Sequence, residues 1–322
     1  MLKILVIQSK FYDFCQSSLI EGLHELSLQN KVKFYCTEQS NYSKVEGQYD
    51  HTLYDDNVAV KFGKDIADLI ILCSNQEAKD GIAESIFRPD KTIFVDGEDF
   101  SKYRKNTEHF ALYFKREMLL SLEHPSNVKP FPFAIENRYF FKSHDEILNN
   151  IKNKNIYLAC MFGPHDETKP DRIWIENTLK NAKLENSVIG NMYDHKNKVA
   201  VDTGNRDHSN YYETLYNSKI CVDGYGSLNC NAARMWEGFA NGCFILTQPI
   251  KIYMPYSFIR GEHYLDFDDE DSLLEAVYNL DNDDYREKVA TNCFKYVLEN
   301  HTTIARVSYL LKECELAGVI NE

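Results

Sequence analysis

The chain has 322 residues, and its 43% hydrophobic and 13% aromatic content supplies enough apolar material for two cores of ordinary size. With 36 Lys and Arg against 49 Asp and Glu, the net charge of −13 disfavours nucleic acid and anionic membranes as the main partners. No run approaches the roughly 18 apolar residues of a transmembrane helix, and the start shows no secretion signal, so we expect a cytoplasmic protein.

The first half of the chain alternates between two kinds of apolar pattern. Residues 2–8 form a short apolar run, and the apolar residues after it recur at helical spacing. This pair of patterns predicts a buried strand followed by an amphipathic helix. Further apolar runs predict strands at residues 32–37, 67–74 and 91–99. Strands that alternate with helices predict a parallel sheet covered by helices on both faces.

A second series of strands follows the polar stretch "NNIKNKN". Its apolar runs predict strands at residues 156–163, 186–193, 219–224, 243–248 and 263–267, and the tail after them predicts two or three helices. We therefore place a domain boundary near residue 150, with domains at 1–150 and 151–322. The fold class is α/β, with two Rossmann-like domains and a ligand cleft between the carboxyl ends of their sheets.

The nine cysteines show no CxxC pair, and most stand inside apolar runs such as "LILCS" and "GCFIL". Buried free thiols explain this placement better than disulfides or a zinc site. The first strand is followed by "QSKFYDF", which has no glycine, so the dinucleotide-binding motif GxGxxG is absent there. The phosphate-binding P-loop motif is absent as well, which disfavours NAD-dependent chemistry and classical nucleotide hydrolysis.

The stretch "DGYGSLNCNAARMWEGFANG" combines a Gly-rich loop with the start of a helix. Backbone N–H groups of such a loop, including Tyr225, Gly226 and Ser227, and the positive end of the helix dipole favour a bound phosphate or diphosphate. Arg234 adds a charge for the same anion, and Glu237, one turn later, can accept hydrogen bonds from sugar hydroxyls. The alternative is a surface ion pair between these two side chains.

Other loops offer weaker candidates. Gly163 ends the strand at 156–163, Arg172 follows this strand, and both are candidates for donor binding. Asp13, Glu98 and Asp99 follow predicted strands of the first domain, and each can act as the base that deprotonates an acceptor, or equally as a helix cap or turn residue.

The string "DFDDEDS" at 266–272 contains carboxylates that can bind a divalent cation. A helix start, capped by Asp271 or Ser272, is the favoured interpretation of this string.

The segment from Tyr211 to Gln248 resembles the donor-binding region of GT-B glycosyltransferases, through "SK" before a strand, the Gly loop, Arg-x-x-Glu and "GCFILTQ". It is most similar to group-1 relatives that include the CgeB-like proteins, with a fainter likeness to exostosin-type enzymes. The resemblance continues through residues 263–302. In that family the positions of Arg234 and Glu237 face the donor diphosphate and the ribose or sugar. Asn229 replaces the first acid of the E-x7-E pattern, so the donor-sugar contacts and the stereochemical outcome stay open.

The resemblance implies two facing Rossmann-like domains in a GT-B fold. The domain at 1–150 would bind the acceptor, and the domain at 151–322 the nucleotide sugar, with the last helix crossing back to the first domain. We expect a glycosyltransferase that uses a nucleotide-sugar donor, a glycan or other hydroxyl acceptor, no metal and no further cofactor. One alternative is a phage-type enzyme that glycosylates a modified DNA base, with "KYRK" and "FKRE" as its basic clusters. Another is an inactive nucleotide-sugar or glycan-binding module.

Overall fold

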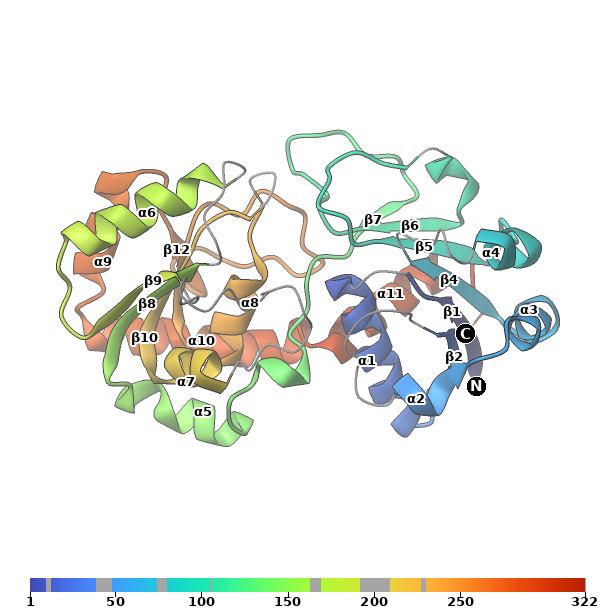
Figure 1. The fold of residues 1–322 in the computed structure, drawn as a ribbon, viewed down its shortest axis with the longest axis horizontal. Coiled ribbons are helices and arrows are strands. Elements are labelled where there is room, and N and C mark those ends of the chain that lie inside the picture. The colour runs from blue at the N-terminus through green and yellow to red at the C-terminus, as the bar shows by residue number, and fades with distance from the viewer. Residues whose placement is uncertain are drawn as a thin grey trace. The chain divides into compact units, whose positions relative to one another are not determined.

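The computed structural model describes residues 1–9, 13–38, 48–73, 80–104, 106–162, 169–191, 209–226 and 230–321. The chain forms two compact α/β units (Figure 1). Unit 1 consists of Met1–Ala134, Ile252–Pro255 and His301–Glu322, and unit 2 consists of Ile135–Lys251 and Tyr256–Asn300.

The units separate after Ala134 and not near residue 150. The reason is that Ile147 and Ile151, which precede the first strand of unit 2, belong to the core of that unit. These residues lie on α5 (His144–Asn150) and on the short helix η4 (Ile151–Asn153).

Unit 1 contains a sheet of seven parallel strands in the order β3-β2-β1-β4-β5-β6-β7. The strands are β1 (Leu2–Ile7), β2 (Val32–Thr37), β3 (Thr52–Leu53), β4 (Leu69–Cys73), β5 (Thr92–Asp96), β6 (Leu112–Lys115) and β7 (Val128–Pro130). The four strands predicted from apolar runs are confirmed. The other three, β3, β6 and β7, have at most four residues each and are too short to show a period.

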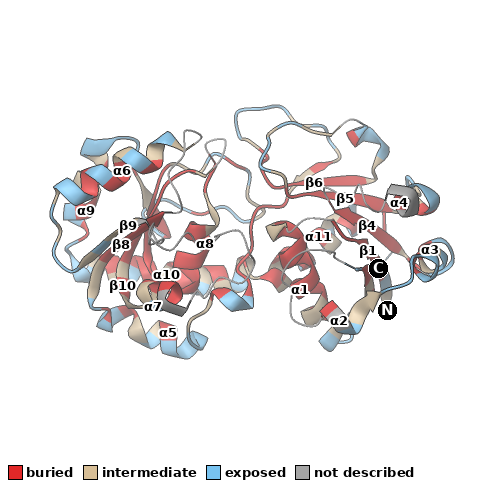
Figure 2. Cartoon of the chain, viewed as in Figure 1, coloured by how far each residue is buried: buried red, intermediate tan, exposed pale blue. Residues whose placement is uncertain are grey.

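The central strands of unit 1, β1, β4, β5 and β6, are largely buried on both faces (Figure 2). Ile4 and Val6 point into one core, and Leu5 and Ile7 point into the other. This explains why the strands are continuous apolar runs without alternation. The helices of unit 1 are α1 (Phe14–Leu28), α2 (Gln48–His51), α3 (Asp56–Asp65), α4 (Asp80–Ile86), η2 (Thr107–His109) and α11 (Thr303–Leu316).

The last helix, α11, belongs to unit 1, although the elements before it belong to unit 2. It packs against α1, and Val307 and Leu310 complete the core on that side of the sheet. Gly22 permits this close approach, because a Cβ atom there would lie 2.4 Å from the carbonyl oxygen of Thr303.

Unit 2 contains a sheet of five parallel strands in the order β12-β11-β10-β8-β9. The strands are β8 (Ile156–Phe162), β9 (Ser187–Asn191), β10 (Ser218–Asp223), β11 (Phe244–Thr247) and β12 (Tyr264–Asp266), and all five confirm predicted strands. The chain runs outward from β8 to one edge through β9 and returns to β10 on the other side of β8. Open α/β sheets bind ligands at the carboxyl ends of strands where the order reverses in this way.

Helices cover both faces of the unit 2 sheet (Figure 1). The helices of unit 2 are η3 (Asn137–Tyr139), α5, η4, α6 (Pro170–Asn181), α7 (Ser209–Asn217), α8 (Ala233–Ala240), α9 (Glu270–Asn279) and α10 (Asp283–Asn300). Of these, α6 and α9 lie side by side on one face, and α7 and α8 lie side by side on the other.

The acidic string at 266–272 leads into α9, which confirms its interpretation as a helix start. Its cap is Asp269, and not Asp271 or Ser272, because the Asp269 side chain accepts the backbone N–H of Ser272 at 2.8 Å. All nine cysteines are buried and free, which confirms that prediction. Among the described helices, none has the length and apolar character needed to cross a membrane.

Candidate functional site

Arg234 lies on the first turn of α8 and reaches the point where the strand order of unit 2 reverses. Its Nε donates to the carbonyl oxygen of Met161 on β8 at 2.6 Å, and its Nη1 donates to Oδ1 of Asp223 at the end of β10 at 2.9 Å. The guanidinium also stacks over the Phe162 ring, 4.7 Å from its centroid. Three contacts therefore fix a buried cation at the carboxyl ends of two strands.

The surface ion pair between Arg234 and Glu237, the alternative explanation of their spacing, is contradicted. Both residues are only 8% exposed, and the ion partner of Arg234 is Asp223. Burial would lower the pKa of Arg234, but the Asp223 carboxylate raises it above its ordinary value, so the guanidinium stays charged.

Asp223 is the residue that holds Arg234, and it is fully buried. Burial raises the pKa of its carboxyl to about 6, although Arg234 and Arg172 act in the opposite direction. Its Oδ2 has no hydrogen-bond partner among the residues that the structure describes. The carboxyl is therefore held by Arg234 on one oxygen, and its ionisation changes close to neutral pH.

The Gly-rich loop is anchored through Tyr225. Its backbone N–H donates to Oε1 of Gln248 at 2.7 Å, its hydroxyl donates to the carbonyl oxygen of Pro249 at 2.7 Å, and its own carbonyl oxygen accepts from Nε of Arg172 at 3.2 Å. The backbone N–H of Gly226 donates to the carbonyl oxygen of Cys230 at 2.7 Å. The backbone N–H groups of Tyr225 and Gly226, two of the predicted phosphate donors, are thus both hydrogen-bonded within the protein.

The start of α8 favours an anion. The N-cap residue Ala232 has no side chain able to accept a backbone N–H, and the first turn contains no acidic residue. The positive end of the helix dipole is therefore not neutralised by the helix itself. Arg172 lies nearby and stacks over the same Phe162 ring as Arg234, 5.7 Å from its centroid. Two arginines and a helix start thus surround one buried carboxylate, Asp223, which offsets part of their positive charge.

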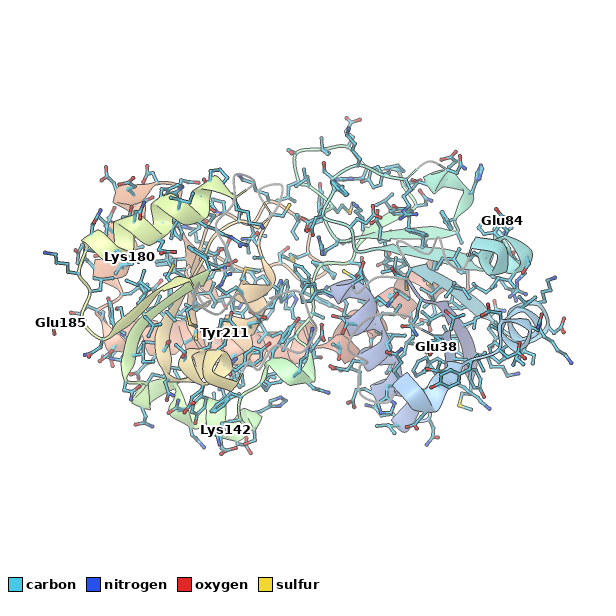
Figure 3. All side chains as sticks on the ribbon, in the orientation of Figure 1. Glu38, Glu84, Lys142, Lys180, Glu185 and Tyr211 are labelled. Carbon is cyan, nitrogen blue, oxygen red and sulfur yellow. The ribbon has the colours of Figure 1, made fainter. Side chains whose placement is uncertain are left out.

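Glu237 is fixed by Tyr211, whose hydroxyl donates to Oε2 of Glu237 at 2.6 Å. Tyr211 comes from α7 and lies where α7 and α8 run side by side (Figure 3). Burial and the Glu237 carboxylate both raise the pKa of Tyr211, so its hydroxyl keeps its proton and acts as a donor. Glu237 is consequently an acceptor whose orientation is fixed by Tyr211.

The three candidates for a base lie in unit 1. Asp13 caps α1 by accepting the backbone N–H groups of Cys15 and Gln16 at 2.7 and 3.1 Å. Its carboxylate also packs against Gly97, where a Cβ atom would lie 2.1 Å from each carboxylate oxygen. Asp13 thus lies next to the loop after β5. It acts as a helix cap, which was the alternative to its predicted role as a base.

The other two candidates pair with arginines. Glu98 forms an ion pair with Arg104 at 2.7 Å. Asp99 forms an ion pair with Arg116, and its side chain is 57% exposed.

The basic cluster "FKRE" is buried and neutralised. Lys115 donates to Oδ2 of Asp96 at 2.8 Å, and both side chains are almost fully buried. Arg116 pairs with Glu117 at 3.0 Å. These two cations therefore contact carboxylates of their own unit and are not presented to a nucleic acid.

Two predicted site residues, Gly163 and Ser227, lie outside the described residues, and so does Asn229. Within the described residues, no group of three or more His, Cys, Asp or Glu side chains could hold a metal ion. Sequence reasoning missed Asp223 as the partner of Arg234 and Tyr211 as the partner of Glu237. A charged residue that ends an apolar strand, as in "ICVDG", was the available signal for Asp223.

Residues 169–312 match a family model described as glycosyl transferase-like. No curated protein matches the chain.

Several solved structures have a similar fold. A glycosyltransferase from Rickettsia africae superposes with a TM-score of 0.64 at 12% identity over 98% of both chains. HepE from Anabaena, in complex with UDP and glucose, gives 0.57 at 10% identity over 98% of this chain and 100% of that one. An alpha-glucosyltransferase in complex with UDP and a 13-mer DNA gives 0.56 at 11% identity over 98% and 99%. The chain therefore has a GT-B fold, and residues 169–312 within it are similar to glycosyl transferase-like proteins.

Proposed function

We propose that this chain, which has a GT-B fold, transfers a sugar from a nucleotide-sugar donor to a hydroxyl acceptor. The observation that carries the proposal is the buried Arg234, held by Asp223 and Met161 beside an uncapped helix start. A cation in a low-dielectric site at the strand-order reversal is suited to a diphosphate. Unit 2 is thus the proposed donor-binding unit.

The donor that we propose is a UDP-sugar, because the similar structures of HepE and of the alpha-glucosyltransferase contain UDP. Arg234 and the start of α8 would neutralise the diphosphate as it leaves, and Glu237, oriented by Tyr211, would accept hydrogen bonds from ribose or sugar hydroxyls. Because protein cations and the helix dipole supply this stabilisation, we propose that transfer needs no metal ion.

The acceptor that we propose is a glycan or another hydroxyl compound bound by unit 1. DNA is less favoured, because Lys115 and Arg116 are buried against Asp96 and Glu117 and Arg104 pairs with Glu98. Among the candidates for a base, Asp99 is favoured over Asp13, because its carboxylate is exposed while Asp13 caps a helix.

The proposal is tested by a thermal-shift screen over nucleotide sugars, followed by a transfer assay with the donor that stabilises the chain. A ligand that binds only the folded state raises its stability. A UDP-sugar should raise the melting temperature, and turnover of that donor should persist in excess EDTA. Donor binding without any turnover, with or without acceptors, would instead favour an inactive binding module. No response to any nucleotide sugar would refute the function.

The affinity for UDP-glucose should rise several-fold as the pH falls from about 8 to about 5.5. The Asp223 carboxyl, whose pKa burial raises to about 6, is charged at the upper end of this range and neutral at the lower end. A neutral Asp223 no longer offsets the charge of Arg234 or repels the donor, and the diphosphate diester of UDP-glucose does not itself titrate there. Isothermal titration calorimetry across this pH range measures the effect.

The matched control is Asp223→Asn, which keeps the shape of the side chain but cannot ionise. Its affinity should vary little with pH. Parallel pH profiles for the native chain and this variant would contradict the assignment of the effect to Asp223.

A further inference from the structure

Lys251 lies in the segment after β11 and is exposed, in contrast to the buried arginines of the site. Its ammonium lies over the ring of Tyr225, 4.3 Å from the ring centroid. No ion pair of Lys251 with a carboxylate occurs within the part of the chain that the structure describes. An aromatic face therefore holds this cation without neutralising its charge.

Tyr225 is a fixed platform for that cation. Its ring is held through the hydroxyl bond to Pro249, and its backbone through the bonds to Gln248 and Arg172. A cation over an aromatic face gains about 0.5–1 kcal/mol at an exposed site. The contact is enough to bias where the Lys251 ammonium lies, and its N–H groups that do not face the ring remain able to donate.

The same arrangement recurs on the neighbouring strand end. Phe162, at the end of β8, carries the guanidinium groups of Arg234 and Arg172 over its ring. Arg172 also contacts the carbonyl oxygen of Tyr225, so it connects the two aromatic platforms. Three cations, Lys251, Arg172 and Arg234, thus lie around the Gly-rich loop. An anion that binds among them reduces the repulsion between their charges.

We propose that Lys251 is a phosphate-contacting residue of the donor site. It donates to the diphosphate of the nucleotide sugar and stabilises the nucleoside diphosphate as it leaves. In that step the bond between the anomeric carbon and the distal phosphate oxygen breaks, and its electron pair stays on the oxygen. The acceptor oxygen forms the new bond to the anomeric carbon and gives its proton to the proposed base, Asp99. This inference rests on the proposed function, because it requires a nucleotide diphosphate at unit 2.

The test compares UDP with uridine as probes for the native chain, Lys251→Met and Lys251→Arg. A charge-assisted hydrogen bond to a phosphate predicts that K251M lowers the affinity for UDP about ten- to hundredfold and leaves the affinity for uridine unchanged. K251R should restore most of the affinity for UDP. The affinity of the native chain for UDP should also fall more steeply with added salt than that of K251M, because an exposed cation is screened.

Lys152→Met is the matched control, because Lys152 is exposed in the same unit and lies on η4, away from the loop. It should leave both affinities unchanged. An equal loss for UDP and uridine in K251M, or no loss for either with an unchanged salt dependence, would overturn the proposal. Failure of the native chain to bind UDP or any other nucleotide would instead refute the proposed function, so the two outcomes are distinguishable.

Discussion

Replacing Arg234 with Ala is expected to reduce the rate of sugar transfer by about 100- to 1000-fold, which is the usual cost of removing one preorganised group that stabilises developing charge. The loss follows from the geometry, because the guanidinium is held on three sides by Met161, Asp223 and Phe162. A donor diphosphate would then meet no fixed cation on α8. The measurement is kcat/KM for the donor identified by the thermal-shift screen.

The same substitution leaves Asp223 buried without its ion partner, which costs about 3–5 kcal/mol when a buried pair is broken. A folding defect must therefore be separated from a catalytic one. The double variant Arg234→Met with Asp223→Asn removes both charges and should recover most of the thermal stability while remaining inactive. If the double variant regained native activity, Arg234 would have no role in donor binding.

Arg234→Lys provides a further control. A lysine keeps the charge but cannot donate to Met161 and Asp223 from one planar group. We expect it to fold, to bind UDP weakly and to retain a small fraction of the activity. Activity within a few-fold of the native chain in Arg234→Ala, measured on folded protein, would contradict the donor assignment.

Replacing Lys154 with Met is expected to destabilise the chain by about 1–3 kcal/mol, because the carbonyl group of Asn241 would lose its ammonium donor. The carbonyl groups of Tyr216 and Leu215 keep a second donor, the side chains of Asn150 and Cys243 respectively. The Lys154 ammonium, only 5% exposed, donates to the carbonyl oxygens of Leu215 at 3.3 Å, Tyr216 at 2.7 Å and Asn241 at 2.8 Å. Burial lowers the pKa of Lys154, and its partners are carbonyl groups that accept hydrogen bonds.

The position of Lys154 explains the size of the effect. Its acceptors lie at the carboxyl ends of α7 and α8, where a cation favours the negative end of the helix dipole. These helices carry Tyr211, Arg234 and Glu237, so loosening their ends should also weaken donor binding.

Urea denaturation of K154M, with Lys152→Met as the exposed control, measures the change in the free energy of unfolding. We expect the control to change it by less than about 0.5 kcal/mol. Equal stabilities of the native chain and K154M would show that the buried Lys154 ammonium makes no net contribution to stability.

Much of unit 2 followed from the sequence, because its central strands β8, β10 and β11 are buried and are continuous apolar runs. The donor segment was also recognisable, since the Gly loop and Arg234 lie within a dozen residues of each other. The partners of Arg234 and Glu237 were not recognisable from the sequence. Asp223 lies 11 residues from Arg234 along the chain, and Tyr211 lies 26 residues from Glu237. Tyr225 and Lys251 likewise meet only because β10 and β11 are neighbours.

The division of the chain shows the same limit. The polar stretch near residue 150 indicates a loop, but it does not indicate to which unit the neighbouring helices belong. Packing determines this, because α5 contributes to the core of unit 2 and α11 to the core of unit 1.

The sequence by itself determined the α/β class, the alternation of strands and helices and the buried thiols, because these depend on local periodicity and composition. Only the tertiary structure decided that Arg234 is a buried cation held by Asp223 rather than half of a surface pair, that Tyr211 orients Glu237, and that the "FKRE" cations are neutralised. Ion pairs and hydrogen bonds depend on distances that are set when strands from distant parts of the chain become neighbours, and local patterns carry no record of those distances.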